Sequence, residues 1–323
     1  MDLVSLRKHV TQNLRFDGLW WRKFAYLGSV YGPEWWKRYS PPVIAAILFG
    51  LIRRNREGAT ANMRNILGDD GSRNPRLAAL QMFVQFAHCM TETMEYYGPH
   101  PRPMRLDVPE HDAFAEALEE GHGAVIVTGH FGNWDIGAKR LRAYGRPVNV
   151  VMAREVNATT HEYVRAAREH VGVRVLYSDT SVFSSLNMIR ALRRNEVVAL
   201  QLDRIPGSAR AIPFFGTPAR FPVGPFVLAR LSGAPLIPVF IPRLGTRHYA
   251  IRIGSRFSLT RDVRDGHALN DVMTQVGREL EAIVREFPTQ WFQFAPFWPT
   301  AAPSVEAAPP MREVIRERIR ARR

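Results

Sequence analysis

The chain has 323 residues, 46% hydrophobic and 23% charged, which is typical of a folded protein with one large domain or two and excludes a disordered chain. Its net charge of +14 favours anionic partners, namely nucleic acid, anionic lipid surfaces, phosphorylated substrates or acidic carrier proteins. The single cysteine, Cys89, excludes a disulfide within the chain and a multi-cysteine zinc site, and it suits a reducing compartment.

Residues 1–110 are predicted to be mostly helical, with Gly and Pro breaks between the helices. The first twenty residues lack the continuous apolar run of a secretion signal. The apolar stretch PPVIAAILFGLI, residues 41–52, is too short for a spanning helix, which needs about 20 apolar residues. We therefore expect peripheral or shallow attachment to a membrane.

Four of the seven tryptophans lie near the start of the chain, interleaved with Arg and Lys. Trp beside cations suits a membrane interface, where the ring lies among the headgroups and the cation meets lipid phosphate. The alternative is a helical extension whose rings are buried on the core. The residues concerned are Trp20, Trp21, Trp35 and Trp36.

Short Val-rich runs with little alternation follow one another after residue 111, as strands buried on both faces do. They are residues 124–129, 148–153, 173–178, 197–202 and 234–242. Residues 133–145, 160–171 and 181–195, which lie between them, are predicted helices. This pattern predicts an α/β fold: a mostly parallel central sheet flanked by helices, with a helical N-terminal region. The predicted parts are residues 1–110, the α/β domain at 111–300, and a Pro/Ala linker with a basic Arg-rich tail at 301–323.

Polar side chains follow several of the predicted strands. His130 follows the first, Arg154 and Asn157 follow the second, and Asp203 with Arg204 follows the fourth. Ligands bind at the carboxyl ends of the strands in open α/β sheets. We therefore expect these side chains to converge on one edge of the sheet.

His130 and Asp135 lie five residues apart in the stretch GHFGNWDIGA. On one helix they would stand roughly 140° apart, so we place His130 at the strand end and Asp135 in the first turn of the next helix. Gly129 and Gly132 permit a tight turn between them, and Asn133 can cap the helix. The Asp135 carboxylate can then hold one imidazole nitrogen while the other takes a proton from a substrate hydroxyl or amine.

The same spacing has an ordinary explanation. His-x4-Asp occurs by chance in many chains, and an Asp is favourable at a helix N-terminus. From spacing alone, a turn histidine is the simpler interpretation. If the site is catalytic, the stretch holds no Ser or Cys nucleophile, so direct attack of the substrate on an activated carbonyl is the chemistry that it suits.

A set of motifs in the α/β part resembles a known family. TGHFGNWDIGA, VMAREVN, LDRIPG, IPFFGTPARFPVGPFVLARLSGAPLIPVFIPR and EFPTQWFQFAPFW are similar to bacterial lipid A late acyltransferases, within the glycerolipid and lysophospholipid acyltransferase superfamily. They also resemble that group's relatives that acylate phosphatidylinositol mannosides. The resemblance covers about residues 120–298. Many members begin with a clear transmembrane helix, which the short stretch at 41–52 does not match.

The resemblance implies that His130 is the general base and Asp135 its orienting carboxylate. It places Arg154 and Asn157 near an acceptor or donor phosphate. No metal or redox cofactor is expected. The remaining predicted substrate-binding residues are Gly132, Asn133, Asp203, Arg204, Phe214 and Phe215, of which the two Phe would line the wall between head group and acyl chain.

Other features have weaker implications. Residues 201–250 hold six Arg and one acid, which suits a phosphate, a phosphopantetheine arm or an acidic carrier protein, or else a solvated basic surface. Cys89 is predicted to be helix core, and residues 287–291 are predicted to pack rather than to catalyse. The scattered histidines show no metal-ligand spacing.

The leading hypothesis is an acyltransferase that moves a fatty acyl group from acyl carrier protein or coenzyme A to a hydroxyl of a membrane glycolipid or phospholipid, such as a lipid A-type precursor. Such an enzyme would act at the cytoplasmic face of the inner membrane. One alternative is N-acylation of an aminolipid or peptide amine by the same base. Another is a non-catalytic basic protein that binds membranes or nucleic acid, although no nucleic-acid-binding signature is present and no nucleic-acid partner is expected.

Overall fold

A mostly parallel six-stranded sheet lies at the centre of the structure, a computed structural model. Its strand order is β11-β8-β2-β5-β3-β4, and only β11 runs antiparallel to its neighbour. The strands are β2 (Ala124–Thr128), β3 (Val148–Met152), β4 (Arg174–Tyr177), β5 (Val197–Gln201), β8 (Leu236–Phe240) and β11 (Arg252–Ile253). The five predicted Val-rich runs are therefore confirmed as strands of one sheet. The described residues are 19–68, 71, 73–109, 113–152, 169, 172–178, 182–204, 207–259 and 266–298.

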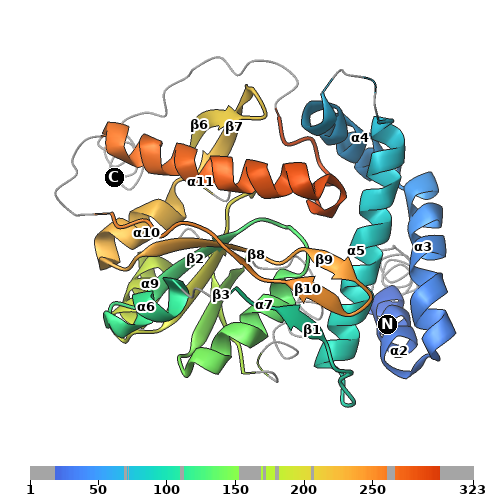
Figure 1. The fold of residues 1–323 in the computed structure, drawn as a ribbon, viewed down its shortest axis with the longest axis horizontal. Coiled ribbons are helices and arrows are strands. Elements are labelled where there is room, and N and C mark those ends of the chain that lie inside the picture. Colours follow the sequence, from blue (N-terminus) through green and yellow to red (C-terminus); the bar gives the residue numbers. More distant parts are fainter. Residues whose placement is uncertain are drawn as a thin grey trace, which may run out of the picture.

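Both faces of the central strands are buried, which explains their unalternated sequences. In β2, Val125 and Val127 face the larger hydrophobic cluster, whereas Ala124 and Ile126 face a second cluster that includes Phe114. The helices around the sheet are α6 (Ala113–Glu119), α7 (Trp134–Leu141), α9 (Val182–Arg193), α10 (Gly224–Ser232) and α11 (Gly266–Glu286), shown in Figure 1. Two predicted helices are confirmed, as α7 with the short 3-10 turn η1 (Arg142–Tyr144) and as α9, while residues 160–168 of the third lie outside the described residues.

The N-terminal region is helical, as predicted. It contains α2 (Leu19–Tyr31), α3 (Glu34–Leu51), α4 (Arg53–Leu67) and α5 (Pro75–Tyr97). Asn74 caps α5 by accepting from the backbone N–H groups of Arg76 and Leu77. Figure 1 shows α5 between the sheet and the outer helices α2 and α3. Within the described part of the chain, no helix combines the length and apolar character needed to cross a bilayer.

Two further sheets were not predicted from the sequence. β1 (Arg105–Asp107), β9 (Arg243–Gly245) and β10 (His248–Ala250) form a three-stranded sheet in the order β1-β10-β9. β6 (Ala209–Phe214) and β7 (Thr217–Pro222) form a separate antiparallel hairpin. A second 3-10 turn, η2 (Pro288–Gln290), follows α11.

The predicted boundary near residue 110 stays a prediction. β1 precedes it, yet this strand pairs with β10 of the α/β part, so contacts run across the boundary. The predicted linker and tail at 301–323 lie outside the described residues.

Candidate active site

Adjacent strands β2 and β5 bring His130 and Asp203 together. The two strands are parallel, and Thr128 lies opposite Gln201 at their carboxyl ends. Each site residue lies two positions beyond one of these partners, and the backbone N–H of Leu202 donates to the carbonyl of Thr128 at 2.8 Å. The His130 Nδ1 and Asp203 Oδ1 atoms are 2.7 Å apart. The expected convergence of these two side chains at one edge of the sheet is therefore observed.

The Asp203 carboxylate is fully buried and well supplied with donors. Its side chain has 0% exposure. Oδ2 accepts from the backbone N–H of His130 at 2.6 Å and from the Trp291 indole Nε1 at 2.8 Å, while Oδ1 faces the imidazole. Burial alone would raise the pKa of Asp203, but the His130 ring and these donors together hold that pKa below its usual value. Asp203 is therefore a carboxylate in the folded protein.

A carboxylate accepts hydrogen bonds but cannot donate them, so its position fixes the tautomer of His130. In the neutral imidazole the proton then belongs on Nδ1, where Asp203 accepts it, and the lone pair belongs on Nε2, which can accept a proton from a substrate. The His130 side chain retains 13% exposure, which leaves it partly accessible. The Trp134 ring meets the imidazole edge-on at a centroid distance of 5.3 Å. The arrangement has the geometry of a general base with a buried orienting carboxylate.

The loop that carries His130 is held by backbone bonds on two sides. The carbonyl of His130 accepts from the N–H of Phe292 at 2.7 Å, and the N–H of Asn133 donates to the carbonyl of Ile241 at 2.9 Å. Gly132 has a φ of +56°, and a Cβ there would lie 1.9 Å from the Ile241 carbonyl oxygen. Gly132 is thus required by both conformation and space, which supports the predicted tight turn.

Asp135 lies in the first turn of α7, where the sequence placed it. It is buried, and its backbone carbonyl accepts a hydrogen bond from the hydroxyl of Tyr97 at 2.5 Å. The carboxylate at His130 Nδ1 nevertheless belongs to Asp203, whereas the sequence argument gave that place to Asp135. The strand order explains the difference, because it sets the end of β5 beside the end of β2.

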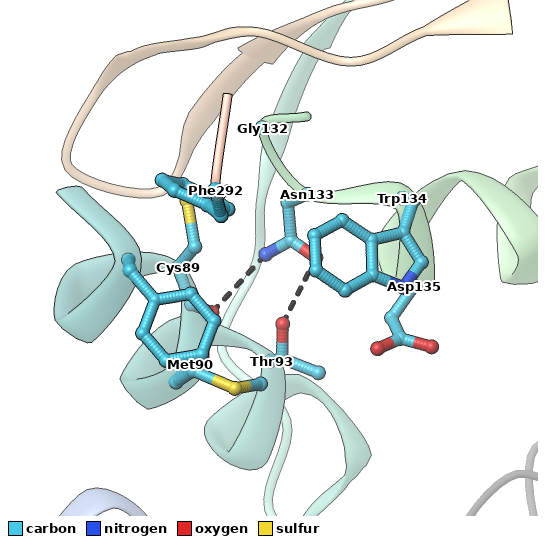
Figure 2. A pocket seen from close by; sticks show the side chains of 9 residues that line it. Cys89, Met90, Thr93, Gly132, Asn133, Trp134, Asp135 and Phe292 are labelled. Carbon is cyan, nitrogen blue, oxygen red and sulfur yellow. Dashed lines mark hydrogen bonds between the residues drawn. The ribbon is translucent and has the colours of Figure 1, made fainter. Parts of the chain in front are cut away.

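A small pocket lies between the His130 loop and α5 (Figure 2). Figure 2 shows Asn133 directed at α5, with hydrogen bonds to the Cys89 carbonyl and the Thr93 hydroxyl. The lining of the pocket is mostly apolar. It includes Phe86, Met90, Trp134 and Phe292 together with Gly132 and Asp135. Cys89 is buried, and burial raises the pKa of its thiol to about 12, which agrees with its predicted role in helix core.

The other predicted substrate-binding residues are less closely grouped. Arg204 is exposed beside Asp203. Arg154 and Asn157 lie outside the described residues. Phe214 is fully buried, with 0% exposure, and its ring lies 5.5 Å from that of Trp291. It therefore helps to hold the indole that donates a hydrogen bond to Asp203.

Phe215 has a φ of +52° at the turn of the β6–β7 hairpin. Its N–H donates to Glu281 Oε2 at 2.7 Å, and the Arg285 guanidinium lies 4.6 Å from its ring. The predicted role of Phe215 in the wall beside the acyl chain stays a prediction.

The basic segment 201–250 divides into two groups in the structure. Arg243 and Arg247 are ion-paired, with Glu92 at 2.8 Å and with Glu95 at 2.6 Å. Arg247 also reaches Glu34 at 2.9 Å. These two arginines therefore hold α5 and α3 in place, while Arg204 and Arg220 are exposed.

Three residues that support the site were missed as functional residues. Trp291 donates to Asp203, although residues 287–291 were predicted only to pack. Gln293 Nε2 donates to the Asp203 carbonyl at 3.3 Å. Asn62, on α4, donates to the carbonyls of Gln293 and Ala295 and accepts from the N–H of Phe297. The aromatic-rich stretch around Trp291 and Gln293 is visible in the sequence, but it does not indicate a partner for either residue, and nothing in the sequence around Asn62 marks it.

Comparison with protein families identifies the group. A family model described as bacterial lipid A biosynthesis acyltransferase matches residues 18–300. The chain belongs to this family. The match includes the N-terminal helices as well as the α/β part, and it confirms the resemblance found in the sequence motifs.

Two similar proteins are phosphatidylinositol mannoside acyltransferases. The one from Mycolicibacterium smegmatis is 28% identical over 197 residues, which are 60% of this chain and 62% of the relative. The one from Mycobacterium tuberculosis (strain H37Rv) is 34% identical over 168 residues, 46% of this chain and 52% of the relative. The match therefore spans between half and two thirds of the length of these family relatives.

Proposed function

We propose that the chain is an acyltransferase in which His130 is the general base and Asp203 orients it. The observation that carries the proposal is the 2.7 Å contact between His130 Nδ1 and a fully buried Asp203 carboxylate, at the carboxyl end of a parallel sheet in a chain of this family. Asp135, which the sequence analysis placed in the orienting role, is proposed to support the loop from the start of α7.

In the proposed reaction, an acceptor hydroxyl donates its proton to His130 Nε2 as its oxygen attacks the carbonyl carbon of an acyl thioester. The tetrahedral intermediate then collapses, the C–S bond breaks, and the thiolate takes the proton back from the imidazolium. The products are an ester and a free thiol, so atoms and charge balance. Asp203 stabilises the imidazolium that forms between the two steps.

The proposed substrates follow from the family and its relatives. The donor is an acyl thioester on acyl carrier protein or coenzyme A. The acceptor is a hydroxyl of a glycolipid or phospholipid, such as a lipid A-type precursor or, as the names of the two relatives suggest, a phosphatidylinositol mannoside. Cytoplasmic donors place the reaction at the cytoplasmic face of the inner membrane. Substrate contacts are proposed for Arg154, Asn157, Arg204, Gly132 and Phe215. The predicted contacts of Phe214 and Asn133 are withdrawn, because Phe214 is fully buried and every hydrogen bond of the Asn133 amide goes to a protein group.

Purified protein supplied with labelled acyl thioesters and a panel of lipid acceptors tests the function. We expect His130→Ala to lower kcat by at least about 100-fold, because a positioned base contributes roughly that much or more. The matched control is His248→Ala, since His248 also contacts an aspartate, Asp107, at 2.7 Å but lies on β10 away from His130. Undiminished transfer by a folded His130→Ala protein would exclude the mechanism.

Mass spectrometry of the products separates the alternatives. An ester on a sugar or glycerol hydroxyl supports the proposal, whereas an amide on an aminolipid or peptide shows N-acylation by the same base. Strong DNA binding that weakens steeply with salt, without any acyl transfer, would support the non-catalytic alternative.

We further propose that the outer face of α2 and α3 rests on a lipid surface. On α3, apolar side chains repeat every four residues, and each is more than half exposed. They are Trp35, Tyr39, Val43, Ile47 and Leu51, and α2 adds Phe24, Leu27 and Tyr31. The opposite face of α3 is buried through Pro41, Ala45 and Phe49. Contiguous exposed apolar surface of this kind is typical of an interface.

Charge favours a membrane as the occupant of this face. Arg38, Arg53 and Arg54 are exposed at or beside α3, where they can meet lipid phosphate. Figure 1 shows α2 and α3 on the outside of α5, away from the sheet. The predicted interface role of Trp35 is thus supported by its exposure, while Trp36 is partly buried and the side chains of Trp20 and Trp21 lie outside the described set.

Co-sedimentation with phosphatidylglycerol-containing vesicles tests the lipid surface. We expect Ile47→Glu to weaken binding by about tenfold or more, because an apolar side chain contributes roughly 1.5–3 kcal/mol when buried. Leu186→Glu is the control, since Leu186 is an exposed apolar residue on α9. Equal binding by both variants would contradict the assignment of this face.

A further inference from the structure

A buried chain of polar side chains runs behind the His130 loop. Asn133 Nδ2 donates to the hydroxyl oxygen of Tyr249 at 3.1 Å, and that hydroxyl in turn donates to Glu92 Oε2. Arg243 closes the chain by donating to Glu92 Oε1 from its terminal nitrogen at 2.8 Å. Glu92, Tyr249 and Asn133 are all buried. The chain connects α5, β9 and β10 to the loop that presents the base.

Asn133 uses its full hydrogen-bonding capacity in this position. Nδ2 donates to Tyr249 and to the Cys89 carbonyl at 3.2 Å. Oδ1 accepts from the Thr93 hydroxyl at 2.9 Å and from the N–H of Ile136 at 3.4 Å, and the second of these bonds caps α7. An amide can make two donor and two acceptor bonds of this type, so Asn133 has one orientation that satisfies every partner.

Glu92 sets the direction of the Tyr249 hydroxyl. A carboxylate can only accept, so this hydroxyl donates to Glu92, and its oxygen is left to accept from Asn133. Backbone partners fix the Asn133 amide itself, because the N–H of Ile136 can only donate to Oδ1 and the Cys89 carbonyl can only accept from Nδ2. Burial, followed by the nearby Cys89 and Glu92, raises the pKa of Tyr249 well above its usual value, which keeps the donating proton in place.

A second route runs from Glu92 to the same loop through Arg243. The backbone N–H of Arg243 donates to Gln290 Oε1 at 2.7 Å, and Gln290 Nε2 donates to the Arg243 carbonyl at 2.8 Å. The Gln290 carbonyl accepts from the N–H of Gly132 at 2.9 Å. Two adjacent loop residues, Gly132 and Asn133, are therefore held by paths that meet at Glu92.

We propose that Glu92 is a positioning residue for the reaction: by turning the Tyr249 hydroxyl so that its oxygen accepts from Asn133, and by pairing with Arg243, it holds the loop that aims His130 at the acceptor. This inference rests on the proposed function. Glu92 does not touch the reacting atoms. A misplacement of about 1 Å at a base can lower a rate by roughly 100-fold, so its effect falls on kcat rather than KM.

The test compares Glu92→Gln with Glu196→Gln. Both glutamates are buried, and both pair with arginine. Glu196 immediately precedes β5, at the end of the sheet opposite His130, and also accepts from Asn149 at 2.9 Å. An amide at position 92 can donate to the Tyr249 oxygen, which turns the hydroxyl proton toward the Asn133 donor and weakens the Asn133–Tyr249 hydrogen bond, whereas the same change at position 196 leaves the His130 loop untouched.

We expect Glu92→Gln to lower kcat about 10- to 100-fold with KM within about threefold of wild type, and Glu196→Gln to keep the wild-type kcat. Ring ¹⁵N chemical shifts supply a readout that needs no acyl transfer. Asp203 keeps the His130 proton on Nδ1 in all three proteins, so the expected change is in ring position: Glu92→Gln is expected to shift or broaden the His130 ring signals, and Glu196→Gln to leave them as in wild type. A proposed function that fails would abolish the kinetic comparison but not this spectroscopic one.

Tyr249→Phe removes the central hydroxyl and keeps the buried ring, so it applies the same test if Glu92→Gln does not fold. A folded variant of either kind with wild-type kcat and wild-type His130 ring signals overturns the proposal. So does an equal loss of kcat in Glu196→Gln. If neither network variant folds where Glu196→Gln does, Glu92 serves folding alone and the positioning role is wrong.

Discussion

A buried carboxylate is stable in a protein interior only when donors replace the water that it has lost. Asp203 has three such donors, from the His130 ring, the His130 backbone and the Trp291 indole. The same carboxylate faces Nδ1 of His130, the proposed base, so the ionisation of Asp203 links the stability of the protein to the proposed catalytic role of His130.

Asp203→Asn is expected to lower the free energy of unfolding by about 3 kcal/mol near neutral pH, because the amide places an N–H group against one of the three buried donors that the carboxylate accepts from. The pKa of Asp203 is lower in the folded protein than its usual value, so the stabilisation is present above the unfolded pKa of about 4 and is lost as pH falls through the lower folded value. The difference in the free energy of unfolding between the wild type and Asp203→Asn should therefore become smaller below about pH 4. Denaturant unfolding from pH 7 to pH 3 measures it, and a gap that stays constant to pH 3 would contradict the assignment.

At this scale, the sequence predicted His130 and its place at a strand end, and it included Asp203 among the residues at the same edge. It did not predict that these two would pair. The spacing of His130 and Asp135 is visible along the chain, whereas the contact with Asp203 depends on which strands are neighbours. Trp291 and Asn62 act through contacts between distant segments, so local pattern gave no indication of either.

Among the elements, the loop between β2 and α7 is the one most constrained by its neighbours. It lies between the segment that follows η2 and the end of β8, with a backbone hydrogen bond on each side. Gly132 is the point of closest approach, because there the chain passes against the Ile241 carbonyl. Any side chain at this point must move one of the two backbones.

Gly132→Ala is expected to destabilise the protein by more than about 2 kcal/mol and to abolish measurable acyl transfer, because its Cβ would meet the Ile241 oxygen at 1.9 Å. Gly145→Ala is the matched control. Gly145 also has a positive φ, +73°, but a Cβ there meets nothing within 4 Å, so only the left-handed conformation costs stability, about 1 kcal/mol. Thermal unfolding and acyl-transfer assays are made on both variants. An equal loss of stability in both would mean that the left-handed conformation, rather than the close contact with Ile241, determines the cost at Gly132.

Helices and strands could be predicted where their burial leaves a clear pattern in the sequence. Strands buried on both faces, such as β2 and β5, have Val-rich runs that identify them. The β6–β7 hairpin was missed because Pro213 and Pro218 interrupt it, and β1, β9 and β10 were missed because each has only three residues. Strand order was beyond reach, since β5 enters the sheet between β2 and β3 although it follows β4 in the chain.

Over the whole molecule, charge and apolar surface act together at the proposed lipid face. The net charge of +14 attracts the chain to anionic lipid from a distance, while the exposed stripe on α3 acts only on contact. Salt screens the attraction between the net charge and anionic lipid, and it leaves the apolar contact of the α3 stripe largely unchanged.

Raising the salt concentration from about 50 mM to about 500 mM should therefore weaken, but not abolish, binding of the wild-type protein to anionic vesicles. In Ile47→Glu the apolar contribution is reduced, so the same rise in salt should remove most of the remaining binding. Vesicle flotation at several salt concentrations measures both. Wild-type binding that disappears completely at high salt would show that charge alone attaches the protein, and the α3 stripe would then need another occupant.

The contact between Asn62 and the segment at 293–297 bears on how far the molecule can be reduced. A protein shortened to the predicted α/β part, residues 111–300, would keep His130 and Asp203 but lose α4, whose Asn62 amide holds the backbone at Gln293, Ala295 and Phe297. It would also lose α5, which provides Glu92 and Thr93. Anyone who wishes to transplant the His130–Asp203 pair into another protein, or to remove the helices of the proposed lipid face for crystallisation, must therefore keep α4 and α5 together with the sheet.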